Sequence, residues 1–227
     1  MTRRNYAYLT LRYLILFLGF YVLSYGIVLS YRAELGVGPW TVLDIGIARN
    51  LGLTLGQASQ LTGILVILAG FLLGIRPTLA TFLNMFVIGE FIDVILSSPL
   101  CPSAPEAYSW RLGYLVAGSF LMGGGAALYI STNLGTGPRD GLMLGLTRLT
   151  SSSMGRVRVA MELTALTLGF FLGGPVGVGT VVSAFLVGPS MERTLRSLAL
   201  FRDHPVLSNI FMIPGSTRIR PRRAHAG

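Results

Sequence analysis

Six apolar runs, each long enough to cross a lipid bilayer, constrain this chain more than any other feature. They lie at about residues 10–31, 57–75, 78–97, 110–131, 156–174 and 177–198. A helix needs about 20 apolar residues to cross roughly 30 Å of hydrocarbon, and an open chain in lipid satisfies its backbone hydrogen bonds only as a helix. Only 12% of the residues are charged, about half the share of a soluble domain. The sequence therefore predicts an all-α, polytopic membrane protein with six transmembrane helices.

Two shorter, moderately apolar segments interrupt this series. Pro39 to Asn50 follows the first run, and Pro138 to Thr150 follows the fourth. Each would form a helix of about 18 Å at 1.5 Å per residue, which is too short to span the hydrocarbon. The sequence therefore predicts two half-helices, at 39–50 and 138–150.

The chain contains an internal repeat with an offset of 99 residues. Residues 35–39 read LGVGP and residues 134–138 read LGTGP, and the register continues without gaps in both directions. Matched glycines include Gly19 with Gly118, Gly26 with Gly125, Gly46 with Gly145, Gly56 with Gly155 and Gly89 with Gly188. Because each copy holds three spans, the second copy must enter the membrane from the opposite side, as an inverted repeat.

The repeat divides the chain into five parts. They are a cytoplasmic N-terminus (1–9), a first repeat (10–99), an outer loop (100–109), a second repeat (110–198) and a basic cytoplasmic tail (199–227). With the N-terminus in the cytoplasm, fifteen of the eighteen arginines fall on the inner side, and only Arg32, Arg49 and Arg111 fall on the outer side. Positive residues concentrate on the cytoplasmic side of membrane proteins, so we expect both termini to be cytoplasmic.

The two Gly-x-Gly-Pro turns are the strongest candidates for a binding site. Glycine lets the backbone approach a ligand closely, and the free N–H groups of a helical first turn favour an anion. In inverted halves the two N-termini could meet near the midplane, as in transporters built from broken helices. The candidate substrate-binding residues are Gly36, Gly38, Pro39, Trp40, Thr41, Gly135, Gly137, Pro138, Arg139 and Asp140. The alternative is that both motifs are turns leading into surface helices in the headgroup region.

Polar residues that differ between the copies are better candidates for function than matched ones. Trp40-Thr41 becomes Arg139-Asp140, Asp44 becomes Met143, and Glu90 becomes Pro189. Arg139 could bind an anion or pair with a carboxylate, and Asp140 could complement the helix dipole.

Carboxylates within the predicted spans and half-helices are candidates for ion coupling, because a buried carboxylate usually faces a cavity or a partner. The candidates are Glu90, Asp44 and Glu162, with Glu90 nearest mid-span. The structural alternative for Glu90 is a protonated side chain or a pair with an arginine such as Arg49.

Composition and motifs exclude several other classes of function. Cys101 is the single cysteine, and both histidines, His204 and His225, lie in the tail, so we expect no metal site and no cofactor. No metalloprotease, nucleophile-elbow or phosphate-loop motif is present in the sequence, and we expect no enzyme activity. The net charge of +9 comes from arginines between apolar runs, which indicates membrane orientation rather than nucleic-acid binding.

These residues resemble a known family. The segment 35–44 (LGVGPWTVLD) and, more specifically, 135–146 (GTGPRDGLMLGL) are similar to the YczE/YitT-type bacterial integral membrane proteins, and the resemblance covers residues 10 to 198. It implies a multi-span fold in the bacterial inner membrane. It implies no particular biochemical activity.

Three functional hypotheses follow from the sequence. The first is a secondary transporter of a small polar or anionic solute, bound at the repeat interface. The second is a passive small-solute channel, and the third is an accessory or substrate-binding membrane subunit of a larger complex. The expected partners are the lipid bilayer, a small solute, and either a second copy or another membrane protein.

The predicted topology can be tested at Cys101. In intact cells, a membrane-impermeant maleimide should label Cys101 from outside, because this residue lies in the predicted outer loop. Labelling that requires access from the cytoplasmic side would reverse the topology.

Overall fold

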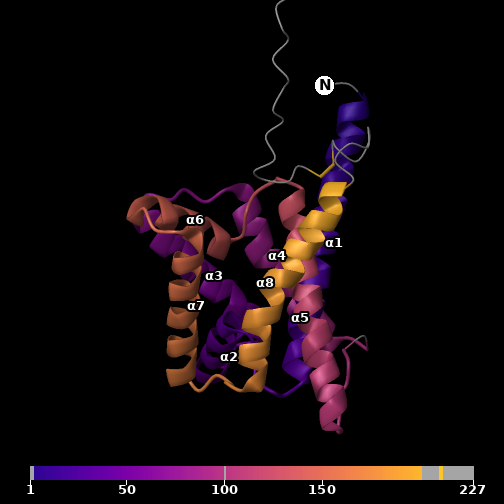
Figure 1. Cartoon of the computed structure of the whole chain (residues 1–227), viewed down its shortest axis with the longest axis vertical. Helices are drawn as coiled ribbons and strands as arrows, with labels where there is room; N and C mark the ends of the chain where they lie inside the picture. The colour runs from indigo at the N-terminus through magenta and orange to yellow at the C-terminus, as the bar shows by residue number, and fades with distance from the viewer. Residues whose placement is uncertain (1–2, 100, 201–209, 212–227) are drawn as a thin grey trace, which may run out of the picture.

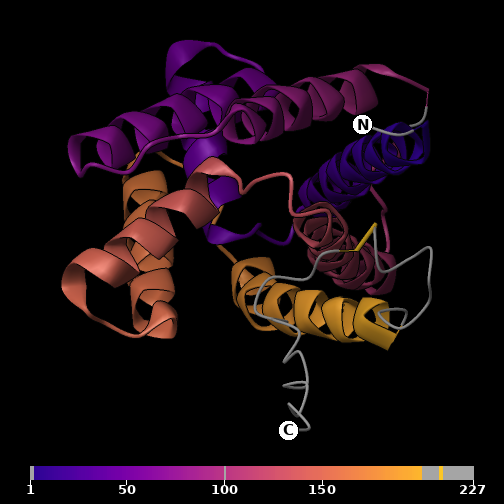
Figure 2. The same ribbon diagram turned by 90° about the horizontal axis from the view of Figure 1, so that it is seen from above.

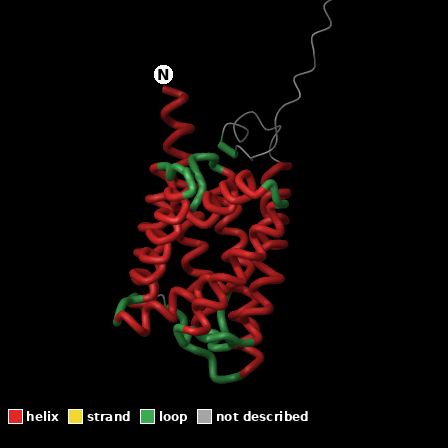
Figure 3. The backbone as a smooth tube through the Cα atoms, turned by 90° about the vertical axis from the view of Figure 1, so that its left-hand side faces the viewer, coloured by secondary structure: helices red, strands yellow, loops and turns green. Residues whose placement is uncertain are grey.

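The computed structural model describes residues 3–99, 101–200 and 210–211, and in this part of the chain every regular element is a helix (Figure 3). The helices are α1 (Arg3–Arg32), α2 (Pro39–Leu51), α3 (Leu55–Leu72), α4 (Leu79–Ser97), α5 (Tyr108–Ser131), α6 (Pro138–Thr150), α7 (Met154–Phe171) and α8 (Val178–Ala199). The all-α prediction is confirmed for this part of the chain. Most of the predicted basic tail lies outside the described residues.

Local sequence signals set the helix ends. Pro39 and Pro138 stand in the first turns of α2 and α6, where a missing N–H costs nothing. Thr54 caps α3 and Thr78 caps α4, each by accepting a hydrogen bond from the third helical N–H. Both short helices occur within one residue of the predicted bounds. The starts of α2, α3 and α4 precede those of α6, α7 and α8 by the predicted offset, as residues 39, 55 and 79 correspond to 138, 154 and 178.

The helices that begin the two halves, α1 and α5, run in opposite directions. In Figure 1, α1 descends from the end that carries the N-terminus, whereas α5 ascends toward that end. In the same view α7 descends and α8 ascends. Seen from above, α8 lies beside α5 (Figure 2).

Glycines bring α1 and α5 into backbone contact. A Cβ on Gly19 would lie 2.9 Å from the carbonyl oxygen of Gly125, and a Cβ on Gly118 would lie 2.7 Å from the carbonyl oxygen of Gly26. These two contacts are equivalent, because Gly19 corresponds to Gly118 and Gly26 to Gly125. Small residues that let backbones approach closely are typical of membrane helix interfaces.

The outer helices attach to this central pair in matching ways. On α4, the Ile88 carbonyl accepts a hydrogen bond of 3.2 Å from Ser24 of α1. At the equivalent place, a Cβ on Gly123 of α5 would lie 2.6 Å from the carbonyl oxygen of Val187 on α8. The apolar core lies beside these contacts and includes the fully buried Phe20.

Four of the described helices are long and apolar enough to cross a membrane, namely α1, α3, α4 and α5. The predicted fifth and sixth spans form α7 and α8, but these two helices are not apolar enough to be counted as membrane spans. The physical reason is polarity, since α7 contains Arg156, Arg158 and Glu162, and α8 contains Pro189 and a charged last third. The count of six spans therefore stays a prediction.

The α1–α5 contact predicts a strong effect of side-chain volume at Gly26. A Gly26→Leu substitution should lower the unfolding temperature in detergent, because overpacking costs about 1–3 kcal/mol or more and the atoms in the way are backbone. Gly113→Leu on α5 is the matched control, since a Cβ there meets nothing within 4 Å. Equal unfolding temperatures for the two variants would contradict the α1–α5 packing.

Candidate functional site

The two Gly-x-Gly-Pro loops dock onto the opposite half of the chain. Gly36 has a φ of 93°, and the carbonyl oxygen of its neighbour Leu35 accepts a 2.7 Å hydrogen bond from the Gly179 N–H at the start of α8. Gly135 has a φ of 149° and packs against Ala80 at the start of α4. Both values of φ favour glycine, and both glycines touch atoms that leave no room for a side chain. The loops therefore bring the first turns of α2 and α6 into the interior.

The first turns of α2 and α6 touch each other. The guanidinium carbon of Arg139 lies 4.6 Å from the centre of the Trp40 ring, within the range of a cation–π contact. Trp40 and Arg139 are equivalent positions of the repeat, so each residue contacts its own counterpart. The first turns of the two short helices are therefore in side-chain contact.

An ion pair joins the two short helices beside this contact. Arg139 Nη2 on α6 lies 3.1 Å from Asp44 Oδ2 on α2. The Asp44 side chain is only 5% exposed, whereas that of Arg139 is 33% exposed. The second carboxylate oxygen of Asp44 is buried and has no hydrogen-bond partner in the described part of the chain. This free oxygen can accept a proton or a hydrogen bond from a ligand.

A second carboxylate, that of Asp140, directly follows Arg139 on α6. Asp140 accepts a hydrogen bond of 2.6 Å from the Tyr129 hydroxyl on α5. Asn84 of α4 lies against Gly137, the residue that caps α6, and its side-chain nitrogen finds no partner of hydrogen-bonding geometry among the described residues. We define the central cluster as Trp40, Asp44, Asn84, Tyr129, Arg139 and Asp140. When its three charged members are ionised, this cluster holds one cation and two anions.

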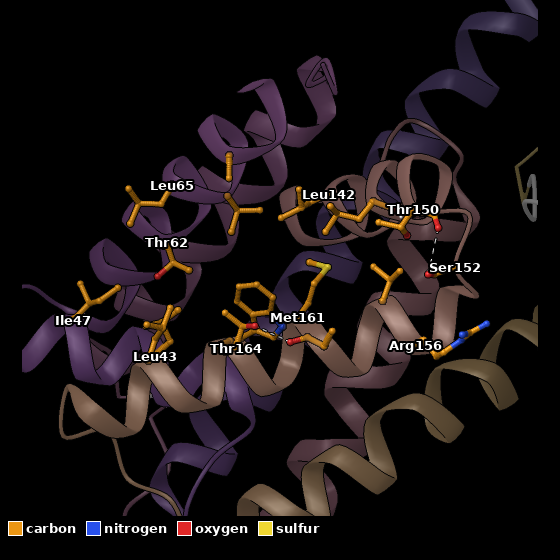
Figure 4. Close-up of a pocket in the computed structure, with 18 of the residues that line it drawn as sticks. Leu43, Ile47, Thr62, Leu65, Leu142, Thr150, Ser152, Arg156, Met161 and Thr164 are labelled. Carbon is orange, nitrogen blue, oxygen red and sulfur yellow. Dashed lines mark hydrogen bonds between the residues drawn. The ribbon is translucent and has the colours of Figure 1, made fainter. Parts of the chain in front are cut away.

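An apolar cavity of about 860 Å³ adjoins the central cluster at Trp40. Figure 4 shows Thr62 and Leu65 of α3 facing Met161 and Thr164 of α7 across it, with Leu142 of α6 above. The hydroxyl of Thr62 is buried and has no partner in the described residues. Arg156 contributes only its stem, because its guanidinium points away from the cavity. A ligand with an apolar body would fit this lining better than a fully hydrated one.

The cavity lies where the α3–α6 pair lacks a backbone contact that the equivalent α2–α7 pair makes. On α7, Gly169 packs directly on the backbone of Leu43 in α2. At the equivalent place between α3 and α6, a Cβ on Gly70 would lie 3.7 Å from the Ile75 side chain and 3.8 Å from the Leu142 side chain. Ile75 occupies the position that corresponds to Gly174, and its side chain lies against Gly145 of α6. This isoleucine holds α6 away from α3, and α6 consequently buries only Pro138, whereas α2 buries seven consecutive residues.

Two predicted ion-coupling residues lie away from the central cluster. Glu90 is exposed on α4 and accepts a 3.1 Å hydrogen bond from Gln60 of α3. Among the described residues Glu90 makes no ion pair with Arg49, and Arg49 donates a 2.7 Å hydrogen bond to the Gly173 carbonyl. Glu162 pairs with Arg158 one turn earlier on α7, at 2.9 Å. Of the three predicted carboxylates, only Asp44 contacts Arg139.

The remaining predicted residues surround the two first turns. Thr41 is buried within α2, and Gly38 lies 3.7 Å, measured to its added Cβ, from the Ser183 side chain. Asn84 and Ser183 are equivalent positions, and each faces the cap of the opposite short helix. The site prediction missed Tyr129 and Thr62, for which the sequence offers no signal beyond a polar atom within an apolar run.

Comparisons with known proteins give the family. Residues 10–195 match the model of a family of unknown function, DUF6198. The chain belongs to this family. It is 35% identical over 182 residues to the "Uncharacterized membrane protein YczE" of Bacillus subtilis, covering 79% of this chain and 83% of that protein.

Two further relatives agree with this family. An uncharacterized protein of Haemophilus influenzae is 39% identical over 178 residues, covering 78% of this chain and 80% of that protein. The "Uncharacterized protein YyaS" of Bacillus subtilis is 27% identical over 179 residues, covering 78% of this chain and 89% of that protein. No solved structure matches the chain. The YczE-type resemblance is confirmed, and the chain is an all-helical membrane protein of this family.

The Arg139–Asp44 pair predicts non-additive effects on stability. Removing either side chain leaves the other charge without its partner. The double variant should therefore lose less stability than the sum of the losses in the two single variants. A double-mutant cycle of Asp44→Ala and Arg139→Ala, measured by thermal unfolding in detergent, should give a coupling energy of about 0.5–3 kcal/mol. Additive losses would mean that the two side chains do not interact in the membrane protein.

Proposed function

We propose that this protein is a secondary transporter of a small organic anion with an apolar body, and that it couples transport to a proton taken up by Asp44. The observation that carries the proposal is the Arg139–Asp44 pair, which links the first turn of α6 to the second turn of α2. Broken helices that meet at the interface of two repeats form the substrate sites of many secondary transporters.

The pair supports coupling by competition. Arginine binds carboxylates through strong, charge-assisted hydrogen bonds, so an anionic solute and ionised Asp44 compete for Arg139. A proton added to the free oxygen of Asp44 removes that carboxylate's charge and releases Arg139 for the solute. Proton and anion are then bound together, and loss of the proton returns Arg139 to Asp44 and expels the anion.

The apolar cavity favours the organic part of the proposed substrate. Trp40 belongs to both the cavity wall and the central cluster, so a carboxylate near Arg139 would place its attached carbon skeleton against Leu43 and Leu142. The volume of about 860 Å³ is within the range of pockets for small molecules. A small inorganic anion would leave most of this apolar surface unused.

The proposed architecture is an inverted repeat of three spans in each half, with both termini in the cytoplasm of a bacterial inner membrane. Three observations support it: the offset of 99 residues in the helix bounds, the opposite directions of α1 and α5, and the excess of arginine on one side. In this arrangement α7 and α8 cross the bilayer with their charged residues near the cytoplasmic face.

Uptake into proteoliposomes tests the proposal. Purified protein should accumulate labelled monocarboxylates with short alkyl or aryl groups when the outside is acidic. Arg139→Ala should lower uptake by about tenfold or more, as expected for loss of a charge-assisted contact of roughly 1.5–3 kcal/mol. Asp44→Asn should retain exchange of solute across the membrane and lose accumulation driven by the pH gradient, because its amide cannot release a proton.

A Glu90→Gln variant tests whether Glu90 rather than Asp44 is the coupling carboxylate, and it should accumulate solute normally. Glu106→Gln, in the exposed α4–α5 connection, is the matched control. Loss of accumulation in Glu90→Gln, with normal accumulation in Asp44→Asn, would assign coupling to Glu90 instead. Uptake that is linear in the gradient and indifferent to pH would favour a passive channel. No uptake by the isolated protein, together with a stoichiometric co-purifying partner, would favour an accessory subunit.

A further inference from the structure

Two helix pairs that the repeat makes equivalent differ in the structure. In the first half, α3 packs along α4 through Gly56 and Gly89, and a Cβ on Gly89 would lie 2.8 Å from the Gly56 carbonyl oxygen. Asp93 of α4 holds this contact, because it accepts a 2.8 Å hydrogen bond from the Gly56 N–H and another from the Thr54 hydroxyl. We call these four residues, Thr54, Gly56, Gly89 and Asp93, the first gate.

The equivalent contact in the second half is not made within the described residues. The counterparts of the first gate are Ser153, Gly155, Gly188 and Glu192, which we call the second gate. A Cβ on Gly155 or on Gly188 would meet no atom within 4 Å, and α7 does not pack along α8 over the described residues. Glu192 instead pairs with Arg196 of its own helix.

The residues of the second gate match those of the first gate in type, although they do not contact one another across α7 and α8. Both glycines are present, a hydroxyl replaces a hydroxyl, and a carboxylate again stands four residues after the glycine of the last helix. This case differs from that of α6, where Ile75 replaces Gly174 and physically blocks the equivalent approach. Within the described part of the chain nothing lies within 4 Å of a Cβ at Gly155 or at Gly188, so the second contact stays available.

We propose that the two gates close alternately, so that the structure represents one of two states that exchange the α3–α4 contact for an α7–α8 contact. This inference rests on the proposed transport function and supplies its alternating access. The first gate lies at the start of α3, away from the end with the N-terminus, and the second lies at the start of α7, near that end (Figure 1). With the N-terminus in the cytoplasm, the gate that is closed in the structure lies on the outer side, and the gate that is open lies on the inner side.

Closing the second gate exchanges hydrogen-bond partners. Glu192 leaves Arg196 and accepts hydrogen bonds from the Gly155 N–H and the Ser153 hydroxyl, as Asp93 does now at the first gate. Pro189 lies inside α8 directly after Gly188, and a proline inside a helix removes a backbone hydrogen bond and produces a kink. Bending of α8 at Pro189 would move the end of the helix toward α7 while its start stays docked on the α1–α2 loop through the Gly179–Leu35 hydrogen bond.

Disulfide trapping in membranes tests the exchange, because a cross-link captures a state that is populated only briefly. Each pair is introduced into a separate full-length chain with Cys101→Ser. The first pair is Gln60→Cys with Phe86→Cys, because the Gln60 side-chain amide donates a 3.2 Å hydrogen bond to the Phe86 carbonyl across α3 and α4. The other pair is the equivalent one, Val159→Cys with Phe185→Cys, whose parent side chains are 55% and 74% exposed. Oxidation followed by a gel shift with a polymer-linked maleimide counts the thiols that remain.

We expect both pairs to cross-link, the first faster than the second. Gly188→Leu should slow the second cross-link by about tenfold or more while leaving the first unchanged, because its side chain occupies space that is free only when the second gate is open. Gly113→Leu is the matched control and should change neither rate. The proposal would be overturned if the second pair forms no cross-link in the time in which the first pair cross-links completely. It would also be overturned if Gly188→Leu leaves the rate of the second cross-link unchanged.

Solute flux separates this inference from the proposed function. Gly188→Leu should also abolish net uptake in proteoliposomes. Normal uptake by Gly188→Leu would overturn the gate while leaving transport intact. Alternate cross-linking without any solute flux would retain the gate and contradict the transporter.

Discussion

The close approach of α1 and α5 is the interaction on which the rest of the structure depends. Two equivalent glycine contacts bring the helix backbones together, and this requires small residues at Gly19, Gly26, Gly118 and Gly125. The pair then positions α4 and α8 on its flanks, and these helices receive the two glycine loops. A side chain at any of the four positions would therefore move the short helices as well as the central pair.

The central cluster follows from that arrangement together with a few differences between the halves. Residues 40 and 139, which correspond in the repeat, are in contact. The contact is favourable because one residue is tryptophan and the other is arginine. The same asymmetry places Asp44 opposite Arg139, where the equivalent of Asp44 is Met143. The repeated sequence thus supplies the scaffold, and differences such as Trp40/Arg139 and Asp44/Met143 supply the chemistry.

The sequence predicted the parts of this structure that depend on local signals and on the repeat. Proline in the first turns of α2 and α6 and the offset of 99 residues placed both short helices within one residue. Tertiary packing decided the rest. Glu90 and Asp93 share a helical face, yet Asp93 contacts the start of α3 and Glu90 lies at the exposed edge, which depends on how α4 rotates against α3. The open α7–α8 pair could not be predicted, because its residues match those of the packed α3–α4 pair.

The central claim, that a solute binds where the two short helices meet, can be tested most directly by tryptophan fluorescence. The chain has two tryptophans, and Trp110→Phe, at a position that is 66% exposed, leaves Trp40 as the single reporter. Titration with short alkyl and aryl monocarboxylates should change Trp40 emission saturably at acidic pH and more weakly at alkaline pH, and the change should vanish in Arg139→Ala. A saturable change of equal size in Arg139→Ala, or no change with any of these anions at either pH, would contradict the account.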